Sequence, residues 1–329
     1  MPRRPLPLPS SLGPSFTRAE ALAAGVTPGR LRAKDLERPF HGVRIVAGAR
    51  SKESDAGPLG ADRLARADLL AEARAIAKAL PPHAFFTGRT AAVLLGAPLA
   101  RGAELVVGVP APARAVRRRG VHGVKVAPHL VHVIEREGLR LASPASAWAS
   151  LGGELSVRDV VVVGDALVRI PRTDGGRPDP GARLATIDQL RHAVDAGRRV
   201  GIGALREAIS HIRVGSASPL ETEYRLDALA AGLPEPELDV EIRDASGRFL
   251  GITEIVHRAQ RVLVEVEGDH HRTSPAQWDR DIEKYGAYVA AGWEVVRLTA
   301  RHIRGACPGA EPRAVRMVRD VLMRRGWHP

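Results

Sequence analysis

The sequence predicts a mixed α/β (α+β) protein in which small sheets are covered by helices. Three observations support this prediction. Residues 216–329 give the order helix, three strands, helix, strand, helix, which is typical of a domain built around a mixed sheet. Residues 51–215 mix amphipathic helices with short apolar strands, and residues 16–50 give two short helices followed by a strand. Residues 1–15 are rich in proline and are expected to form a flexible lead-in.

The composition is that of a folded protein and excludes several classes. The chain has 329 residues, of which 44% are hydrophobic and 26% charged, so wholesale disorder is excluded. One cysteine is too few for a disulfide framework and fits a reducing compartment. No apolar run is long enough for a membrane span, and prolines interrupt the N-terminus before a signal peptide could form. We therefore expect a soluble cytoplasmic protein with no membrane partner.

Positive charge is concentrated in the first two thirds of the chain. The formal net charge is +12, from 49 Lys and Arg against 37 Asp and Glu. Residues 1–216 hold 33 basic and 19 acidic residues, whereas residues 217–329 hold 16 and 18. This asymmetry suggests a polyanion-binding part joined to a part with another task. The alternative is that arginine is merely abundant in a chain rich in alanine, glycine and arginine.

Residues 16–50 are predicted to form a winged helix-turn-helix. Thr17 can cap a first helix, Thr27 and Pro28 can begin a second one, and residues 41–46 alternate as a strand does. In such a module the second helix enters the major groove of DNA. The expected DNA contacts are Arg30, Arg32 and Lys34 of the second helix and Arg44 of the strand.

The middle region, residues 51–215, is predicted to be a small α/β unit. Its most basic stretch, residues 114–125, has five basic residues and no acidic one. Such a stretch is either a solvated loop or a phosphate contact. Its candidate DNA contacts are Arg117, Arg118 and Arg119.

A hairpin in residues 216–329 is predicted to gather three glutamates. With its turn centred on residues 258–259, Glu254 lies diagonal to Glu265 on the face opposite the core valines, and Glu267 follows on that face. Neighbouring carboxylates repel one another unless a cation holds them, and Mg²⁺ or Mn²⁺ suits oxygen ligands. The alternative is the solvated acidic face of an edge strand.

Residues 217–300 resemble the very-short-patch-repair (Vsr)-like endonuclease domain of the restriction-endonuclease-like P-D-(D/E)-x-K superfamily, as found in actinobacterial proteins. The matching motifs are S-P-x-E-T, G-L-P-x-P, E-x-E-G-D-x-H, W-x-R-D-I and A-G-W-x-V-V-R, in the expected order. The N-terminal part is similar to the AbiEi-type antitoxin family, through its A-G-V turn and H-G-V strand. The resemblance implies four regions: residues 1–15, 16–50, 51–215 and 216–329.

The resemblance also implies site residues. Glu221, Glu254, Glu265, Glu267 and His271 match catalytic positions, and Glu254 with Glu265 would bind the metal. His270, Asp281 and Lys284 match or lie beside supporting positions. The chain departs from the family pattern in two ways. No lysine occupies the x-K position, which leaves the catalytic base unassigned, and Glu254 stands where the family usually has aspartate.

These observations favour a DNA-binding protein whose C-terminal domain hydrolyses double-stranded DNA with Mg²⁺ or Mn²⁺. The longer side chain at residue 254 keeps a second hypothesis open, a non-cleaving repressor or antitoxin-like protein with a degenerate nuclease fold. A third is an interaction protein without a DNA role, against which the arginine clusters argue. The sequence leaves open a homodimer and a toxin or defence-system partner.

Overall fold

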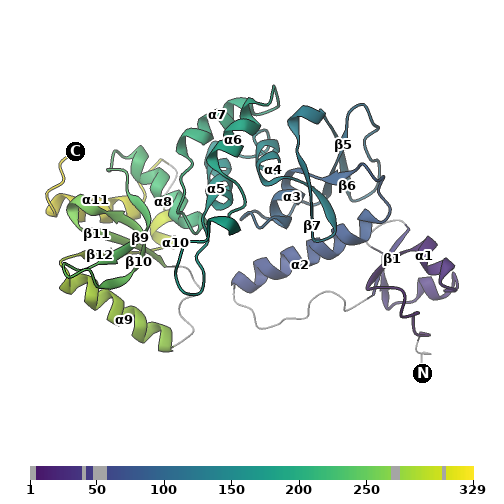
Figure 1. Ribbon diagram of the computed structural model, residues 1–329, viewed down its shortest axis with the longest axis horizontal. Helices are drawn as coiled ribbons and strands as arrows, with labels where there is room; N and C mark the ends of the chain where they lie inside the picture. Colours follow the sequence, from purple (N-terminus) through teal and green to yellow (C-terminus); the bar gives the residue numbers. More distant parts are fainter. Residues whose placement is uncertain (1–4, 39–41, 47–57, 268–274, 306–308) are drawn as a thin grey trace. The chain divides into compact units, whose positions relative to one another are not determined.

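The computed structural model describes residues 5–38, 42–46, 58–267, 275–305 and 309–329, without the side chains of residues 58–62 and 275–281. The fold is mixed α/β, as predicted, with three sheets in the described part (Figure 1). Two compact units are present: Met1–Gly153 with Gln189–Ile202, and Glu154–Asp188 with Gly203–Pro329. The described helices include none with the length and apolar character needed to cross a membrane.

A small three-stranded sheet begins the first unit. It contains β1 (Ser15–Thr17), β2 (Leu36–Glu37) and β3 (Val43–Val46) in the antiparallel order β1-β3-β2, beside α1 (Arg18–Ala23). Thr17 caps α1 as predicted, because its hydroxyl accepts from the Glu20 amide while the Glu20 carboxylate accepts from the Thr17 amide. Leu8 and Leu12 of the lead-in pack against this small core.

The predicted second helix of this module is wrong. Only a 3₁₀ turn, η1 (Arg30–Arg32), forms after Thr27, and the chain then turns into β2. The Thr27 hydroxyl does accept from the Arg30 amide, at 3.2 Å. The Arg30 side chain ends the turn by donating to both carboxylate oxygens of Asp35, at 2.8 and 2.6 Å. A segment this short cannot sustain an α-helix without packing along its length.

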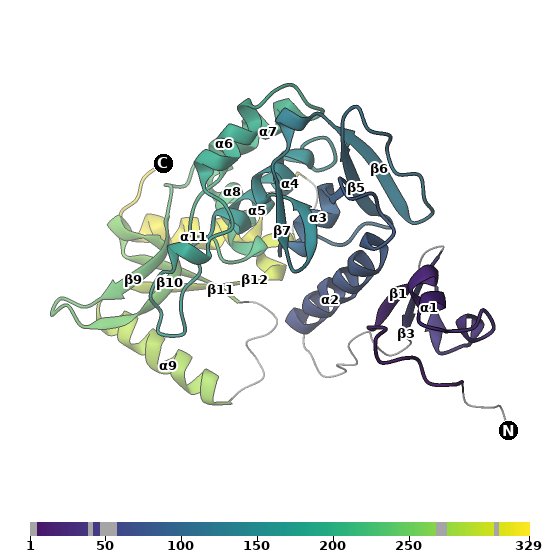
Figure 2. The ribbon, with the colours of Figure 1, turned by 45° about the vertical axis from the view of Figure 1, so that its right-hand side comes forward.

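A five-stranded mixed sheet forms the rest of the first unit (Figure 2). Its strands, in the order β6-β5-β4-β8-β7, are β4 (Phe85–Phe86), β5 (Leu105–Pro110), β6 (Val121–Val126), β7 (Val133–Arg136) and β8 (Leu139–Ala142). The accompanying helices are α2 (Pro58–Ala77), α3 (Gly88–Leu94), η2 (Pro128–Leu130), α4 (Pro144–Ser150) and α6 (Ile187–Asp195). The short apolar strands predicted for the middle region are thereby confirmed.

The segment between β5 and β6 returns across β6, because the two strands are parallel neighbours. A Cβ added at Gly123 would lie 2.0 Å from the Val116 carbonyl oxygen, so only glycine permits this crossing. The basic residues 117–119 are thereby held in a defined loop beside the edge strand of the sheet.

The second unit is built on a four-stranded mixed sheet of order β12-β11-β10-β9. Its strands are β9 (Glu237–Arg243), β10 (Phe249–His257), β11 (Val262–Glu267) and β12 (Glu294–Thr299). Its helices are α5 (Val157–Val168), η3 (Pro180–Ala182), α7 (Ile202–His211), α8 (Pro219–Ala230), η4 (Arg258–Gln260), α9 (Pro275–Ala290), α10 (Ala300–Arg304) and α11 (Arg313–Arg324). The predicted element order is confirmed, with α10 as an addition.

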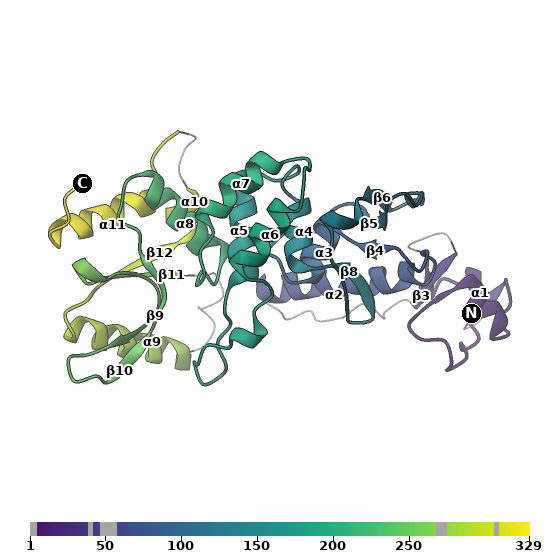
Figure 3. The ribbon, with the colours of Figure 1, turned by 45° about the horizontal axis from the view of Figure 1, so that its top comes forward.

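Helices cover both faces of this sheet (Figure 3). One face packs against α8, α10 and α11 through residues such as Tyr224 and Val318. The other packs against α9, where Tyr288 meets Val256 and Leu263. The sheet is therefore buried on both sides, and the expectation that its acidic face lies away from any core is wrong.

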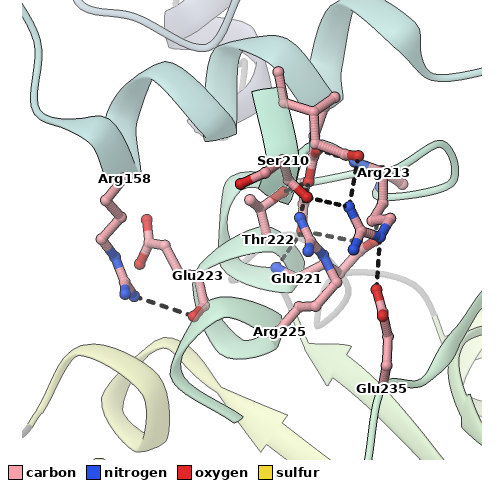
Figure 4. Close-up of polar contacts among 12 residues, drawn as sticks. Arg158, Ser210, Arg213, Glu221, Thr222, Glu223, Arg225 and Glu235 are labelled. Atoms are coloured by element: carbon pink, nitrogen blue, oxygen red, sulfur yellow. Dashed lines mark hydrogen bonds and ion pairs between the residues drawn. The ribbon is translucent and has the colours of Figure 1, made fainter. Parts of the chain in front are cut away.

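The second unit also includes α5, which the sequence division at residue 216 assigns to the middle region. The contact of α5 with α8 depends on Asp165, a buried residue of α5 that is 1% exposed. It accepts from the Thr222 hydroxyl and from Arg225 Nη2 of α8, each at 2.8 Å, and from the Arg213 amide at 2.8 Å. Figure 4 shows Thr222, Arg225 and Arg213 in this network. The sequence signal for this buried network is an aspartate inside the apolar run 159–168.

Replacing Asp165 with alanine should destabilise the second unit by about 3–5 kcal/mol, because it leaves Arg225, itself fully buried, without its carboxylate. Urea unfolding followed by circular dichroism measures this loss. Asp227→Ala is the matched control, since its partner Arg158 has a side chain that is 40% exposed and the pair should contribute below about 1 kcal/mol. Equal losses in the two variants would contradict the assignment.

Candidate acidic site

The hairpin of β10 and β11 has a different register from the predicted one. His257 pairs with Val262 and Ile255 with Val264, a shift of two residues. The cause is the connection, in which η4 is followed by Arg261 in the left-handed conformation, with φ 53°. The predicted two-residue turn is therefore wrong. The observed register, continued by one residue, brings Glu254 opposite Glu265 rather than diagonal to it.

The strand pairing is interrupted at Glu254. On the β9 side, Thr253 pairs with Val240 and Ile255 with Leu238, and the two residues between these pairs, Glu254 and Asp239, are skipped. Asp239 adopts a left-handed conformation, with φ 53°, which reverses the side-chain alternation of β9 at this point. On the β11 side, the Val266 amide donates to Glu254 Oε2 at 2.7 Å. A carboxylate thus replaces a main-chain carbonyl and is fixed at the interruption.

Arg172 secures the strained residue. Its guanidinium donates from Nε to both Asp239 carboxylate oxygens, at 2.8 and 3.0 Å, and from Nη2 to the Asp239 carbonyl at 2.8 Å. Its Nη1 donates to the Gly176 carbonyl at 2.6 Å. A left-handed conformation is unfavourable for aspartate compared with glycine, so these hydrogen bonds offset the strain.

Glu221 enters the site from the first turn of α8. Ser218 caps the helix, and its hydroxyl also donates to Glu221 Oε1 at 2.7 Å. Glu221 Oε2 accepts from the Ala217 amide at 2.6 Å. The side chain is only 3% exposed, and burial raises the pKa of Glu221, with a further contribution from Asp239. These two hydrogen bonds and the charge of Arg169 oppose that rise.

Glu254 has a strongly perturbed carboxyl group. Burial, together with the charges of Glu221 and Glu265, raises the pKa of Glu254 to about 8. The hydrogen bond from Val266 and the charge of Lys284 oppose the shift without cancelling it. The structure brings Glu254 and Glu265 of the hairpin together, whereas the third glutamate predicted there, Glu267, binds Arg297 instead. Glu221, which the resemblance implies, also acts on Glu254, and the combined negative charge is only partly compensated.

Glu265 is the acid with a direct cationic partner. Lys284 Nζ of α9 lies 3.0 Å from each carboxylate oxygen, and the Thr253 hydroxyl donates to Oε1. The ammonium also lies 5.6 Å from the centre of the Tyr288 ring. A Cβ at Gly251 would lie 2.5 Å from the Tyr288 hydroxyl, so glycine at this position lets α9 approach the sheet. Lys284 was expected as a supporting residue and lies within the site.

The remaining predicted residues of the C-terminal region lie elsewhere or outside the described residues. Glu267 accepts from Arg297 Nε at 2.8 Å and from the Tyr285 hydroxyl at 3.3 Å. His270 and His271 fall in residues 268–274, which are outside the described part. Asp281 lies on α9, but its side chain is not described.

The predicted DNA-contact residues divide into exposed and bound side chains. Arg32, Lys34, Arg117 and Arg119 are exposed, and Arg118 is half-buried. Arg30 is bound to Asp35, with its side chain 9% exposed, so its charge is already neutralised. Arg44 donates to the Leu31 and Val43 carbonyls and has a structural role. Burial, with the nearby charges of Arg38 and Arg18, lowers the pKa of Arg44.

Sequence reasoning missed Asp239, Thr253 and Arg172. Asp239 follows a strand pattern without a turn signal, so its left-handed conformation leaves no mark in the sequence. Arg172 lies in a Pro- and Gly-rich segment, residues 171–183, whose composition is typical of an exposed loop. The long-range contact between this segment and β9 could not be inferred from local patterns.

The oxygen donors at the site suit a hard cation, but their present arrangement is not that of a complete metal site. Within the described residues, no set of three His, Cys, Asp or Glu side chains converges closely enough to hold a metal ion. A buried carboxyl group with a raised pKa, such as that of Glu254, is one that a divalent cation would stabilise in the ionised form. Both carboxylate oxygens of Glu265 are already bound by Lys284.

Comparisons with known proteins identify relatives without a described activity. The chain is 27% identical over 241 residues to an uncharacterized protein of Mycobacterium tuberculosis strain CDC 1551, MT2308, covering 72% of this chain and 82% of the relative. It shows the same identity and coverage with the uncharacterized protein Rv2248 of strain H37Rv. No protein-family profile matches the chain.

The raised pKa of Glu254 predicts that stability falls with rising pH. Because its pKa is about 8 in the folded protein and near 4.5 when unperturbed, the protonated form stabilises the fold below pH 4.5 and this contribution is lost between pH 4.5 and 8. Without divalent cations, Glu254→Gln should abolish this pH-dependent decrease in the free energy of unfolding, which is on the order of a few kcal/mol.

Urea unfolding at several pH values tests this prediction. Glu135→Gln, at an exposed residue of β7, is the control and should keep the pH dependence of the wild type. A Glu254→Gln protein that loses stability from pH 5 to 8 as the wild type does would contradict the prediction.

Proposed function

We propose that the second unit is a metal-dependent endonuclease domain that hydrolyses phosphodiester bonds in DNA. The observation that carries the proposal is the Glu254 carboxyl group, held between Glu221 and Glu265 with its pKa raised to about 8. Perturbed carboxyl groups of this kind are typical of functional sites. The similarity of residues 217–300 to Vsr-like endonuclease domains supports the same function.

Glu254 and Glu265 would hold Mg²⁺ or Mn²⁺, with Glu221 contributing negative charge beside them. When bound, the ion would polarise a phosphoryl oxygen and lower the pKa of an attacking water. The chain's own residues set the conditions for binding. The Val266 amide orients Glu254, the Thr253 hydroxyl orients Glu265, and Lys284 balances the charge of Glu265.

Other residues would bind the nucleic acid. Arg32 and Lys34 of the small N-terminal module, and Arg117 and Arg119 of the loop before β6, are exposed and can contact phosphates. Each neutralised phosphate contributes to a salt-dependent, sequence-independent affinity. The partner that this charge favours is double-stranded DNA. His271, which matches a catalytic position of the family, would act as a base or leaving-group acid.

We expect Mg²⁺- or Mn²⁺-dependent cleavage of double-stranded DNA by the full chain, lost on addition of a chelator. Glu254→Gln and Glu265→Gln should each lower the rate by at least about 10²-fold, because each removes a charged ligand from the ion that stabilises the transition state. Glu254→Asp should also be slower, since a shorter side chain would not reach the Val266 amide in the same way. Gel assays on supercoiled and linear DNA measure these rates.

Glu135→Gln is again the control. Cleavage that needs no divalent ion, or that survives both glutamine substitutions, would contradict the proposed site. Cation-induced thermal stabilisation of the wild type, absent in the two glutamine variants, provides a readout independent of cleavage.

A second candidate function is a non-cleaving DNA-binding repressor or antitoxin-like protein. The observation that favours it is the contact of Lys284 with both oxygens of Glu265, which occupies a predicted metal ligand. In that case the protein binds duplex DNA with the salt dependence of phosphate contacts, shows no cleavage with either ion, and gains no thermal stability from them. The same assays therefore separate the two functions.

A further inference from the structure

The segment that follows α5 is fixed on two sides of the acidic site. At its start, the Arg169 amide donates to the Asp165 carbonyl at 2.9 Å, and the Asp165 carboxylate contacts Thr222, the neighbour of Glu221 on α8. Three residues later, Arg172 binds Asp239, which faces the interruption at Glu254. Residues 169–172 therefore run between the helix that carries Glu221 and the strand irregularity that orients Glu254.

Arg169 lies at the start of this segment with an exposed side chain. Among the residues that the structure describes, its guanidinium has no hydrogen-bond or ion-pair partner within contact distance, yet its charge acts on Glu221 and opposes the rise in pKa that burial causes there. It is thus close to the acidic site and keeps its N–H donors available. An exposed arginine in this position can bind an anion without first breaking an ion pair.

The neighbouring cations differ from Arg169 because each already has a carboxylate partner. Lys284 binds Glu265, Arg172 binds Asp239 and Arg297 binds Glu267. A DNA phosphate that approached three carboxyl groups would be repelled unless a positive charge met it. The guanidinium group presents several N–H donors in a plane that matches two phosphate oxygens.

We propose that Arg169 binds the phosphate group of the DNA substrate at the acidic site, donating N–H groups to its non-bridging oxygens. The proposal rests on the endonuclease function proposed above and adds a substrate-binding residue that lies outside residues 217–300. Arg172 has a different role as a positioning residue, since its guanidinium is committed to Asp239 and Gly176.

The test compares Arg169→Ala, Arg169→Gln and Arg169→Lys with the matched control Arg177→Ala. Arg177 lies in the same segment, is exposed, and its side chain makes no hydrogen bond or ion pair with the described residues. The full chain is assayed for cleavage of a short DNA duplex with Mg²⁺ and with Mn²⁺. Thermal unfolding of each variant shows whether the fold is retained, and Arg169→Gln provides a second neutral variant should alanine disturb the end of α5.

Arg169→Ala and Arg169→Gln should lower kcat/KM by about 10²-fold, the usual effect of removing one donor to a transition-state oxyanion. Arg169→Lys should recover part of this loss, and Arg177→Ala should match the wild type. A wild type that cleaves while the neutral Arg169 variants keep the rate of Arg177→Ala would overturn the role of Arg169 alone. A wild type that cleaves with neither ion would overturn the endonuclease function, and this role with it.

Discussion

The site depends on one interruption in a sheet. Where β9 and β10 would continue their pairing, Asp239 turns into the left-handed region and Glu254 is skipped. Glu254 then directs its carboxyl group to the Val266 amide of the next strand. In a regular strand, the Glu254 side chain would alternate with those of its neighbours between the two faces of the sheet. The break instead holds it between a buried helix glutamate and a buried strand glutamate, where burial and the two neighbouring charges raise the pKa of Glu254.

Residues from several parts of the second unit offset the repulsion among these carboxyl groups. Lys284 comes from α9, Arg172 from the segment after α5, and the helix with Glu221 is fixed by Asp165 through Thr222 and Arg225. None of these contacts is local in sequence. Removing any one of these contacts would leave a buried charge or a strained residue less compensated. The acidic site and the contact of α5 with α8 accordingly belong to one compact unit.

The sequence could predict the elements better than their contacts. Periodicity identified α8, the strands β9 to β12 and two of the glutamates that meet, Glu254 and Glu265. The hairpin register could not be predicted, because a left-handed Arg261 adds residues to the turn without a glycine to mark it. The predicted second N-terminal helix does not form. Thr27 and Pro28 can begin a 3₁₀ turn as well as an α-helix, and Arg30 then pairs with Asp35.

We predict that Glu254 is protonated near neutral pH because it is buried and because Glu221 and Glu265 lie beside it. Carbon-13 NMR of side-chain carboxyl groups in glutamate-labelled protein, with Glu254→Gln to assign the signal, measures this directly. The account predicts that Glu254 titrates near pH 8 without divalent cations and at lower pH with Mg²⁺. A titration near pH 4.5 that Mg²⁺ leaves unchanged would contradict it.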